Sequence, residues 1–512
     1  MGNKTIELDD RAWSIEDLLA VADSDVGLTL SADPTWRARI ESSATHLAKR
    51  LASGDIVYGV NTGFGESCDV RIPDDLVHEL PLHLTRFHGC GLGKPLDDQA
   101  ARAVMIARAI TLAKGYSGVR MELLEQLLAL IQHDIIPIIP EEGSVGASGD
   151  LTPLSYVAAA MVGERNVRYG GETIAASDAL QRIGRAPLVL QPKEGLALMN
   201  GTSVMTALAA LAFQRADYLL RLSCHITALG IEALMGNRTH YRPELFVLKP
   251  HPGQARVAQR IYELLHLSRE AAPEYRLQDR YSFRCAPHVI GVLADAAPSM
   301  RAFIETELNS VDDNPLIDGE NEEILHGGHF YGGHIAFAMD GMKNAVANIG
   351  DLLDRQVALV TDRKSNNNLP ANLSGAEGDR AQINHGFKAL QISISAWTAE
   401  ALKLTMPASA FSRSTECHNQ DKVSMGTIAA RDALRVIELC EQVAAAALLI
   451  MQQGVLIRLK RGEVQRDALQ PALAAFAEDI GTTFSFLDED RPLEQDLKNI
   501  LAKIRSRYWD IE

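Results

Sequence analysis

Residues 203–235 constrain the fold more than any other part of the chain. They read SVMTALAALAFQRADYLLRLSCHITALGIEALM, one long segment with helical apolar spacing on more than half of its circumference. The stretches 334–363, 381–405 and 425–459 share this pattern. Helices with so wide an apolar surface are typical of the interior of a bundle. We therefore predict a mainly α fold with a long central helical bundle.

The rest of the chain is expected to pack around this bundle in separate regions. A chain of 512 residues is longer than one hydrophobic core usually serves. We predict a loop-rich N-terminal region at 1–200, the central bundle at 201–475 and a C-terminal helical tail at 476–512. Strand signals are weak and local, and ERNVRYGGETI at 164–174 predicts a small hairpin.

Charge and cysteine usage exclude several classes of protein. The formal net charge of −16 argues against a nucleic-acid partner, because phosphates attract clustered Lys and Arg. The first residues, MGNKTIELDDRAWSIEDLL, are acidic and amphipathic, unlike a secretory signal. The longest apolar run, 443–451, is too short to span a bilayer. The six cysteines lack CxxC spacing, which is typical of reduced thiols. We expect a cytoplasmic protein without a membrane partner.

Residues 143–153, GSVGASGDLTP, form an unusually bare segment whose only ionisable side chain is Asp150. A phosphate-binding loop is one interpretation of the glycine loops here. However, GLGKP at 91–95 has His88 where a P-loop needs glycine, and Pro95 where it needs a hydroxyl. An ordinary glycine turn is the second interpretation, and spacing alone favours it.

The third interpretation makes the backbone itself the reagent. Gly149 has an unshielded amide nitrogen and Ala147 an unhindered carbonyl. In a tight, strained turn the two can join, and loss of two waters, one through the Ser148 hydroxyl, leaves an electrophilic methylidene-imidazolone. None of the twenty side chains supplies such an electrophile.

A histidine-rich stretch raises a different hypothesis, that of a helical-bundle protein that binds a metal or is an inactive scaffold. HGGHFYGGH places His326, His329 and His334 within nine residues. The intervening glycines disfavour a helical ligand face, and HExxH is absent, so we assign no metal.

Several segments together resemble the aromatic amino acid ammonia-lyases and aminomutases, the histidine/phenylalanine/tyrosine ammonia-lyase family. GSVGASGDLTPLS is similar to the segment that forms this family's prosthetic group. The other similar segments follow in the family's order: VYGVNTGFG (57–65), LMNGTSVMTA (198–207), LQDRYSFRCAPHVIG (277–291), DDNPLI (312–317) and NQDKVSMG (419–426).

The resemblance implies a 4-methylideneimidazol-5-one (MIO) group made from Ala147, Ser148 and Gly149. It also implies a mainly α homotetramer whose active sites combine loops from several subunits, acting on a small aromatic amino acid. Tyr58 matches the family's base, which removes the β-proton. Tyr281 matches a second pocket tyrosine.

The resemblance also implies the residues that hold the substrate and the prosthetic group. Asn200 matches the amide that contacts the MIO oxygen, where negative charge develops. Arg284 suits a bidentate grip on the substrate carboxylate. The other matching pocket positions are Gly65, Asn314, Phe330 and Gln278.

Two pairs of residues bear on the choice of substrate. Phe87 and His88 occupy the family's selectivity positions, and an imidazole there can hydrogen-bond a para-hydroxyl. Asn419 and Gln420 are a neutral pair where histidine lyases typically carry a glutamate at the second position. The prediction is a tyrosine ammonia-lyase giving trans-p-coumarate, with lesser activity on L-phenylalanine to give cinnamate. A histidine ammonia-lyase giving urocanate and a tyrosine 2,3-aminomutase are the alternatives.

Overall fold

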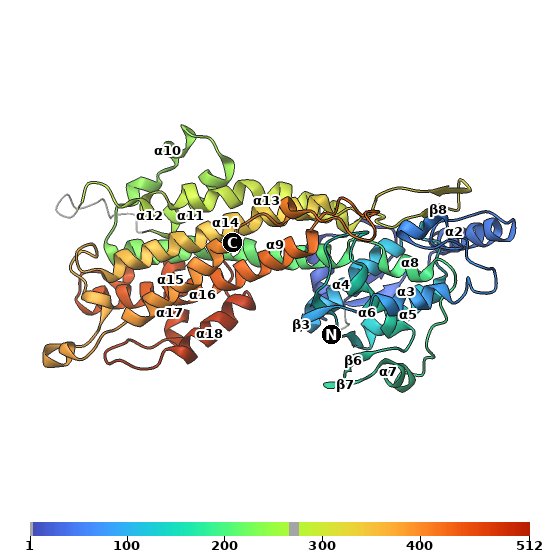
Figure 1. The fold of residues 1–512 in the computed structure, drawn as a ribbon. Helices are drawn as coiled ribbons and strands as arrows, with labels where there is room; N and C mark the ends of the chain where they lie inside the picture. The colour runs from blue at the N-terminus through green and yellow to red at the C-terminus, as the bar shows by residue number, and fades with distance from the viewer. Residues whose placement is uncertain (1–3, 266–275, 512) are drawn as a thin grey trace. The chain divides into compact units, whose positions relative to one another are not determined.

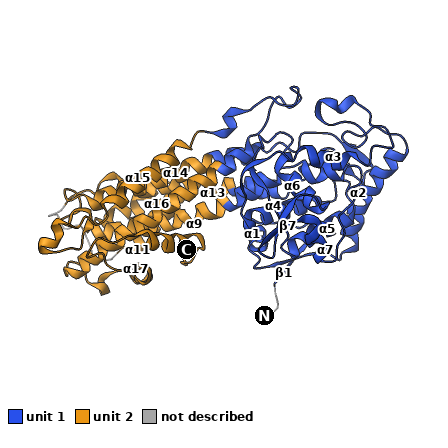
Figure 2. Cartoon of the chain, turned by 60° about the horizontal axis from the view of Figure 1, so that its bottom comes forward, with its two compact units in different colours: residues 1–211, 301–340, 407–431 blue, residues 212–300, 341–406, 432–512 orange. Residues whose placement is uncertain are grey.

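The computed structural model describes residues 4–265 and 276–511, and helices dominate it (Figure 1). Helices account for 59% of the structure and strands for 7%. The predicted mainly α fold with a helical bundle is confirmed. The chain divides into two compact units (Figure 2): unit 1 comprises 1–211, 301–340 and 407–431, and unit 2 comprises 212–300, 341–406 and 432–512.

Both units are discontinuous in sequence because four long helices begin in one unit and end in the other. These helices are α9 (Ser203–Leu234), α13 (Ala286–Leu308), α14 (Gly333–Thr361) and α16 (Gly426–Lys460). A division of the chain into three consecutive segments therefore does not describe how its residues cluster. Segments 301–340 and 407–431 pack with the N-terminal region.

Unit 2 is built mainly from long helices, with α9, α13, α14, α15 (Lys388–Lys403) and α16 side by side in Figures 1 and 2. Residues 443–451 of α16 are all buried, as expected for a helix surrounded by others. The long helices predicted from apolar spacing are confirmed. The one predicted at 381–405 starts late, at Lys388, because residues 378–382 form a 3₁₀ turn instead.

Shorter helices complete unit 2. They are α10 (Pro243–Val247), α11 (Pro252–Leu264), α12 (Tyr281–Arg284), α17 (Pro471–Thr483) and α18 (Glu494–Arg505). Helices α17 and α18 contact each other, and the C-terminal tail is helical, as expected.

Unit 1 combines helices with small sheets. Its helices before α9 are α1 (Ile15–Ala22), α2 (Pro34–Ala52), α3 (Leu80–Phe87), α4 (Asp98–Leu112), α5 (Met121–Gln132), α6 (Leu151–Met161), α7 (Ala176–Arg182) and α8 (Glu194–Met199). Helix α4 forms much of the core, since its residues 100–112 are all buried. It starts where the Asp97 carboxylate accepts a hydrogen bond from the amide of Ala100 at 2.8 Å.

The strands of unit 1 pair locally. β1 (Thr5–Leu8) is parallel to β2 (Gly27–Leu30), and the antiparallel pairs are β3 (Leu92–Pro95) with β5 (Pro140–Glu142) and β8 (Leu316–Asp318) with β9 (Glu323–Leu325). A three-stranded sheet has the order β4 (Ile136–Pro137), β6 (Asn166–Tyr169), β7 (Glu172–Ala175). In its register Asn166 faces Ala175 and Tyr169 faces Glu172, so the predicted hairpin at 164–174 is confirmed.

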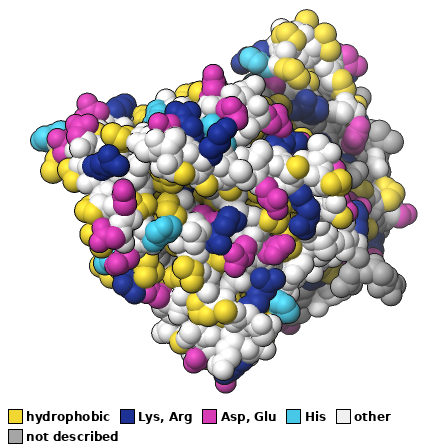
Figure 3. Space-filling model, turned by 90° about the vertical axis from the view of Figure 1, so that its right-hand side faces the viewer, with side chains coloured by type: hydrophobic (Ala, Val, Ile, Leu, Met, Phe, Trp, Pro, Cys, Tyr) yellow, Lys and Arg dark blue, Asp and Glu magenta, His cyan; other side chains and the backbone are white. Residues whose placement is uncertain are grey.

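The surface carries charges of both signs. On the face shown in Figure 3, Lys and Arg side chains are interspersed with Asp and Glu. No described helix is both long enough and apolar enough to cross a lipid bilayer.

Candidate active site

A cavity of about 1050 Å³ lies within unit 1 and brings together most of the predicted site residues. Its walls come from segments far apart in the sequence, between residues 58 and 423. The predicted residues that line it are Tyr58, Gly65, Phe87, His88, Ala147, Ser148, Asn200, Asn314, Phe330, Asn419 and Gln420.

Tyr58 stands on a loop that folds back on itself. The amide of Gly65 donates a hydrogen bond of 2.9 Å to the Tyr58 phenol oxygen. Gly65 has φ +58°, a conformation that suits glycine. Asn61 fixes the start of the loop, because its side chain accepts from the amide of Val57 and donates to the carbonyl of Asp55, both at 2.8 Å.

The surroundings of Tyr58 act in opposite directions on its acidity. Burial raises the pKa of the phenol above its usual value, and the negative charges of the Cys68 thiolate form and of Glu416 raise it further. The hydrogen bond from the Gly65 amide lowers it. A phenolate at this position is therefore supported by one backbone donor and opposed by burial and by its acidic neighbours.

The segment 146–149 is tightly curved. Gly146, Ser148 and Gly149 have φ of +73°, +53° and +74°. At Gly149 an added Cβ would lie 2.1 Å from the carbonyl oxygen of Gly201, so no other residue fits. The Asn200 amide donates a 2.7 Å hydrogen bond to the Ser148 carbonyl oxygen.

These features fit an MIO group made from this segment. Ring closure needs a residue without a side chain at the attacking nitrogen, and Gly149 meets that need. The Ser148 carbonyl oxygen would become the ring oxygen, and Asn200 already contacts it. The Gln420 amide donates to the Ser148 hydroxyl at 3.3 Å, on the other side of the residue.

Asp150, to which the sequence assigned no role, holds the segment to its neighbours through buried hydrogen bonds. It is fully buried and accepts hydrogen bonds from the amide of Met205 at 2.9 Å, from the hydroxyl of Ser144 at 3.1 Å and from the hydroxyl of Thr427. Burial raises its pKa to about 6, against the lowering effect of these donors. Its position as the segment's only ionisable side chain was the available signal.

A second buried network lies next to Gly201, whose backbone packs against Gly149. The Asp312 carboxylate accepts from the amide of Thr202 at 2.7 Å, from its hydroxyl at 2.8 Å and from the Arg108 guanidinium at 3.0 Å. Arg108 has no exposed surface. Sequence reasoning missed this pair because Arg108 lies inside a helix pattern and Asp312 at the edge of a motif.

Phe87 and His88 end α3 at the cavity wall. Their ring centroids are 4.3 Å apart. The Nδ1 atom of His88 lies 3.0 Å from the carbonyl oxygen of Leu84, so Nδ1 carries the proton as donor and Nε2 remains the second ring nitrogen. Burial lowers the pKa of His88, which keeps the ring neutral.

The other cavity residues come from two loops. The Asn314 side chain accepts from the amide of Gly327 at 2.8 Å and thereby holds the loop that carries Phe330. Asn419 and Gln420 end a turn at 415–420, where the Gln420 oxygen accepts from the Thr415 hydroxyl at 2.8 Å. Both polar atoms of the Gln420 amide are thus engaged by protein groups.

Four predicted residues do not line this cavity, among them Gly149, which packs against the backbone of Gly201. Tyr281 and Arg284 form α12 in unit 2, and Gln278 lies just before it. Tyr281 is 71% exposed, and the Arg284 guanidinium lies 4.7 Å from the centroid of its ring. The cavity of one chain therefore contains no arginine from the predicted set.

The histidine-rich stretch does not gather as a metal site. Within residues 4–265 and 276–511, no three His, Cys, Asp or Glu side chains form a cluster that could hold a metal ion. His326 lines the cavity, whereas the ring of His334 lies 5.2 Å from that of Phe303.

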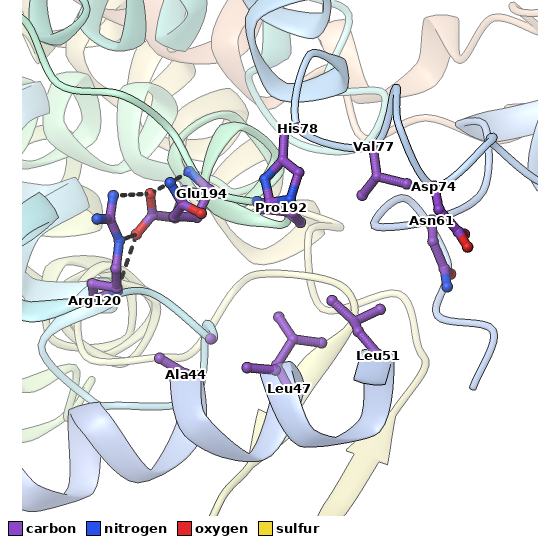
Figure 4. Close-up of a pocket in the computed structure, with 13 residues that line it drawn as sticks. Ala44, Leu47, Leu51, Asn61, Asp74, Val77, His78, Arg120, Pro192 and Glu194 are labelled. Atoms are coloured by element: carbon purple, nitrogen blue, oxygen red, sulfur yellow. Dashed lines mark hydrogen bonds and ion pairs between the residues drawn. The ribbon is translucent and has the colours of Figure 1, made fainter. Parts of the chain in front are cut away.

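A smaller pocket of about 430 Å³ also lies in unit 1 (Figure 4). Leu47 and Leu51 form an apolar floor, and Arg120 is paired with Glu194 at one end. The Arg120 charge is already used in this pair, and none of the predicted catalytic residues lines the pocket. The larger cavity is therefore the candidate active site.

Comparison with known proteins agrees with this geometry. Residues 13–479 match the aromatic amino acid lyase family. The histidine ammonia-lyases of Myxococcus xanthus and Gloeobacter violaceus are 36% and 37% identical, over 99% and 96% of this chain and 98% and 94% of theirs. The crystal structure of tyrosine aminomutase from Streptomyces globisporus superposes with a TM-score of 0.91 at 33% identity, covering 99% of each chain.

These comparisons overturn the predicted tyrosine specificity. Eight relatives at 34–37% identity, over 88–99% of this chain, are all histidine ammonia-lyases, so a tyrosine ammonia-lyase giving p-coumarate is wrong. The prediction relied on the neutrality of Gln420. In the structure the Gln420 oxygen accepts from the Thr415 hydroxyl, and its nitrogen donates to the Ser148 hydroxyl, the group that MIO formation would remove.

The family in general depends on an MIO group, and its members are typically homotetramers that act on small amino acids. The loop that carries Tyr58, a curved Ala-Ser-Gly segment and the Asn200 amide at its carbonyl lie at one cavity in this chain. The match covers most of the sequence. The chain belongs to the aromatic amino acid lyase family and is a carbon–nitrogen lyase of the ammonia-lyase type.

Proposed function

We propose that this protein is a histidine ammonia-lyase, which converts L-histidine into trans-urocanate and ammonia. The observation that carries the proposal is its similarity, over nearly the whole chain, to histidine ammonia-lyases. The arrangement of the cavity supports the same reaction class, because it places a potential base and a potential electrophile in one space.

Ala147, Ser148 and Gly149 form the MIO group in this proposal. When formed, the group supplies an electrophile that takes up the substrate amine and makes nitrogen a better leaving group. Asn200 holds the carbonyl oxygen of Ser148 at 2.7 Å and stabilises negative charge on it.

Tyr58 removes the β-proton, and the Gly65 amide stabilises the phenolate that this role requires. His88 offers the ring nitrogen that is not bonded to Leu84 to the substrate ring. Phe87 and Phe330 provide apolar contact with the ring, and Asn314 holds the loop of Phe330.

The substrate carboxylate needs a cation to bind it. The predicted cation, Arg284, does not line the cavity of its own chain. We propose that Arg284 and Tyr281 enter this site from a neighbouring subunit of a homotetramer. Both lie in unit 2 and outside the cavity lining, and Tyr281 is exposed. Each active site then combines residues of more than one chain.

The test is incubation of the purified protein with L-histidine, L-tyrosine and L-phenylalanine in parallel, with the unsaturated acids measured. We expect urocanate to form fastest. Faster formation of p-coumarate or cinnamate would contradict the histidine assignment while leaving the reaction class intact.

The MIO group has its own measurement, intact mass. The wild-type chain should be lighter than its sequence by two waters, and borohydride should inactivate it. Ser148→Ala, which lacks the hydroxyl that must leave, is the matched control and should have the mass of the unmodified chain. A wild-type mass equal to the sequence would refute the MIO assignment.

A tyrosine 2,3-aminomutase is the second candidate. The specific observation in its favour is the similarity to the structures of tyrosine aminomutase from Streptomyces globisporus and of phenylalanine aminomutase from Pantoea agglomerans, each with a TM-score of 0.91. It shares the electrophile but returns ammonia to the β-carbon. Detection of a β-amino acid as main product would favour it over simple elimination.

A further inference from the structure

The turn at residues 415–420 contacts two other parts of the cavity. Its Glu416 contacts residues 58–66, which carry Tyr58 and are called the base loop below. Its Gln420 contacts residues 146–149, which are called the reactive segment below. Thr415 and Gln420 close it with two backbone hydrogen bonds, at 3.1 and 3.3 Å. Glu416, Cys417 and His418 all have positive φ, between +51° and +68°. This closed turn fixes the directions of the Glu416 and Gln420 side chains.

The Glu416 carboxylate lies on the base loop. Both of its oxygens accept from the amide of Glu66, at 3.0 and 3.2 Å. The preceding amide, that of Gly65, donates to the phenol oxygen of Tyr58 at 2.9 Å. A Cβ on Gly65 would lie 2.3 Å from a Glu416 oxygen, so the carboxylate packs directly against this peptide. Two successive amides thus bind Tyr58 and Glu416.

Glu416 also contributes negative charge near Tyr58, beside Cys68. Among the described residues that line the cavity it is the sole carboxylate, and the other ionisable groups there are Cys68, His88, His326, Tyr331 and Lys422. The groups that act electrostatically on Tyr58 are Cys68 and Glu416, and both oppose its ionisation. Removing the Glu416 charge therefore makes the phenolate easier to form.

We infer that Glu416 is a positioning residue of the active site. Its carboxylate docks the Gly65–Glu66 peptide so that the Gly65 amide reaches the Tyr58 oxygen, and its charge raises the pH above which Tyr58 acts as base. This inference rests on the role of Tyr58 in the proposed function. Glu416, which was not among the predicted site residues, would thus influence the acidity of Tyr58.

The test is the pH dependence of kcat/KM in two variants of the full-length enzyme. Glu416→Gln keeps the shape and one acceptor oxygen but removes the charge, so the ascending limb of the profile should move to lower pH with kcat little changed. Glu416→Ala also removes the acceptor. The limb should move in the same direction, and kcat should fall about tenfold or more because the loop is no longer docked.

Asp69→Asn is the matched control. Asp69 is an exposed carboxylate on the same loop that does not line the cavity, so its variant should keep the wild-type limb. A limb that stays in place in both Glu416 variants, or that moves equally in Asp69→Asn, would overturn the inference. A purely structural role would lower activity without moving the limb.

Failure of the proposed function can be told apart from failure of this inference. If Tyr58→Phe keeps wild-type activity, Tyr58 is not the base, and the proposed function fails at that residue. An intact mass two waters below the sequence in each Glu416 variant shows that the reactive segment still forms its product. In that case a changed profile comes from the base loop alone.

Discussion

At the level of single residues, one hydrogen bond favours ionisation of Tyr58, while burial and two neighbouring groups oppose it. Its oxygen accepts from the Gly65 amide, while burial raises its pKa. In the proposed function the Tyr58 oxygen takes the β-proton, and Tyr58→Phe removes this atom while leaving the ring in place. We expect kcat to fall by about 10²–10⁴, the usual contribution of general base catalysis. Steady-state kinetics on L-histidine would measure it.

The control for this variant is Tyr169→Phe in β6, a tyrosine outside the cavity lining. It should retain wild-type kcat. The intact mass of Tyr58→Phe should still be two waters below its sequence, because Tyr58 takes no part in closing the ring. A Tyr58→Phe enzyme that keeps full activity would rule out the base assignment.

The role of a residue could be predicted only where it follows from the sequence around that residue. Asn200 stands in a recognisable motif, and its amide does reach the Ser148 carbonyl. The role of Glu416 could not be foreseen, because its partner amide lies 350 residues away in sequence. Gln420 misled the substrate prediction because one neutral side chain was weighed more heavily than the rest of the chain, which is similar to histidine ammonia-lyases over nearly its whole length.

At the level of elements, Asp150 connects the starts of three helices. It precedes α6, and its carboxylate accepts from Met205 near the start of α9 and from Thr427 near the start of α16. Its pKa is raised to about 6 in the fold, from an ordinary value of 3.8. The folded state thus holds the proton more tightly than the unfolded state. The stability from this group is full below about pH 4 and is lost as pH rises through 6.

Asp150→Asn imitates the protonated acid and should remove this pH dependence. Between pH 4 and pH 7, the unfolding free energy of the wild type relative to the variant should fall by up to about 3 kcal/mol. Urea unfolding at the two pH values would measure the difference. A constant difference would mean that the Asp150 carboxyl titrates normally.

The helices themselves were predictable because apolar periodicity records burial along a continuous segment. The long helices α9, α14, α15 and α16 follow from it directly, whereas α13 was not among the predicted segments. The grouping of 301–340 and 407–431 with the N-terminal region was not predictable, since it depends on where helices that cross the unit boundaries end. Periodicity carries no information about such pairings.

At the level of the whole molecule, the absence of Arg284 from the residues that line the cavity predicts a shared active site. Tyr58→Phe and Arg284→Ala should each be nearly inactive alone. Tetramers assembled from equal amounts of both should regain about a quarter of wild-type activity, since random mixing gives that share of sites with both wild-type residues. Activity of the co-expressed, doubly tagged and purified tetramers would measure this.

The outcome is specific to residues contributed by different subunits. If Tyr58 and Arg284 of the same chain served one site, every site in the mixture would carry one defect, and activity would stay at the level of the separate variants. Mixing Tyr58→Phe with Ser148→Ala, whose positions line the same cavity, gives the matched comparison and should restore nothing.

The contact between Gly149 and Gly201 has a consequence for how such an enzyme can diversify. Every nucleotide change that replaces Gly149 adds a side chain 2.1 Å from a backbone oxygen, and no neighbouring side chain can move to relieve that clash. Variation that changes the substrate is therefore expected at other residues that line the cavity, such as Phe87 and His88. Gly149 is therefore expected to stay unchanged while other residues of the cavity vary.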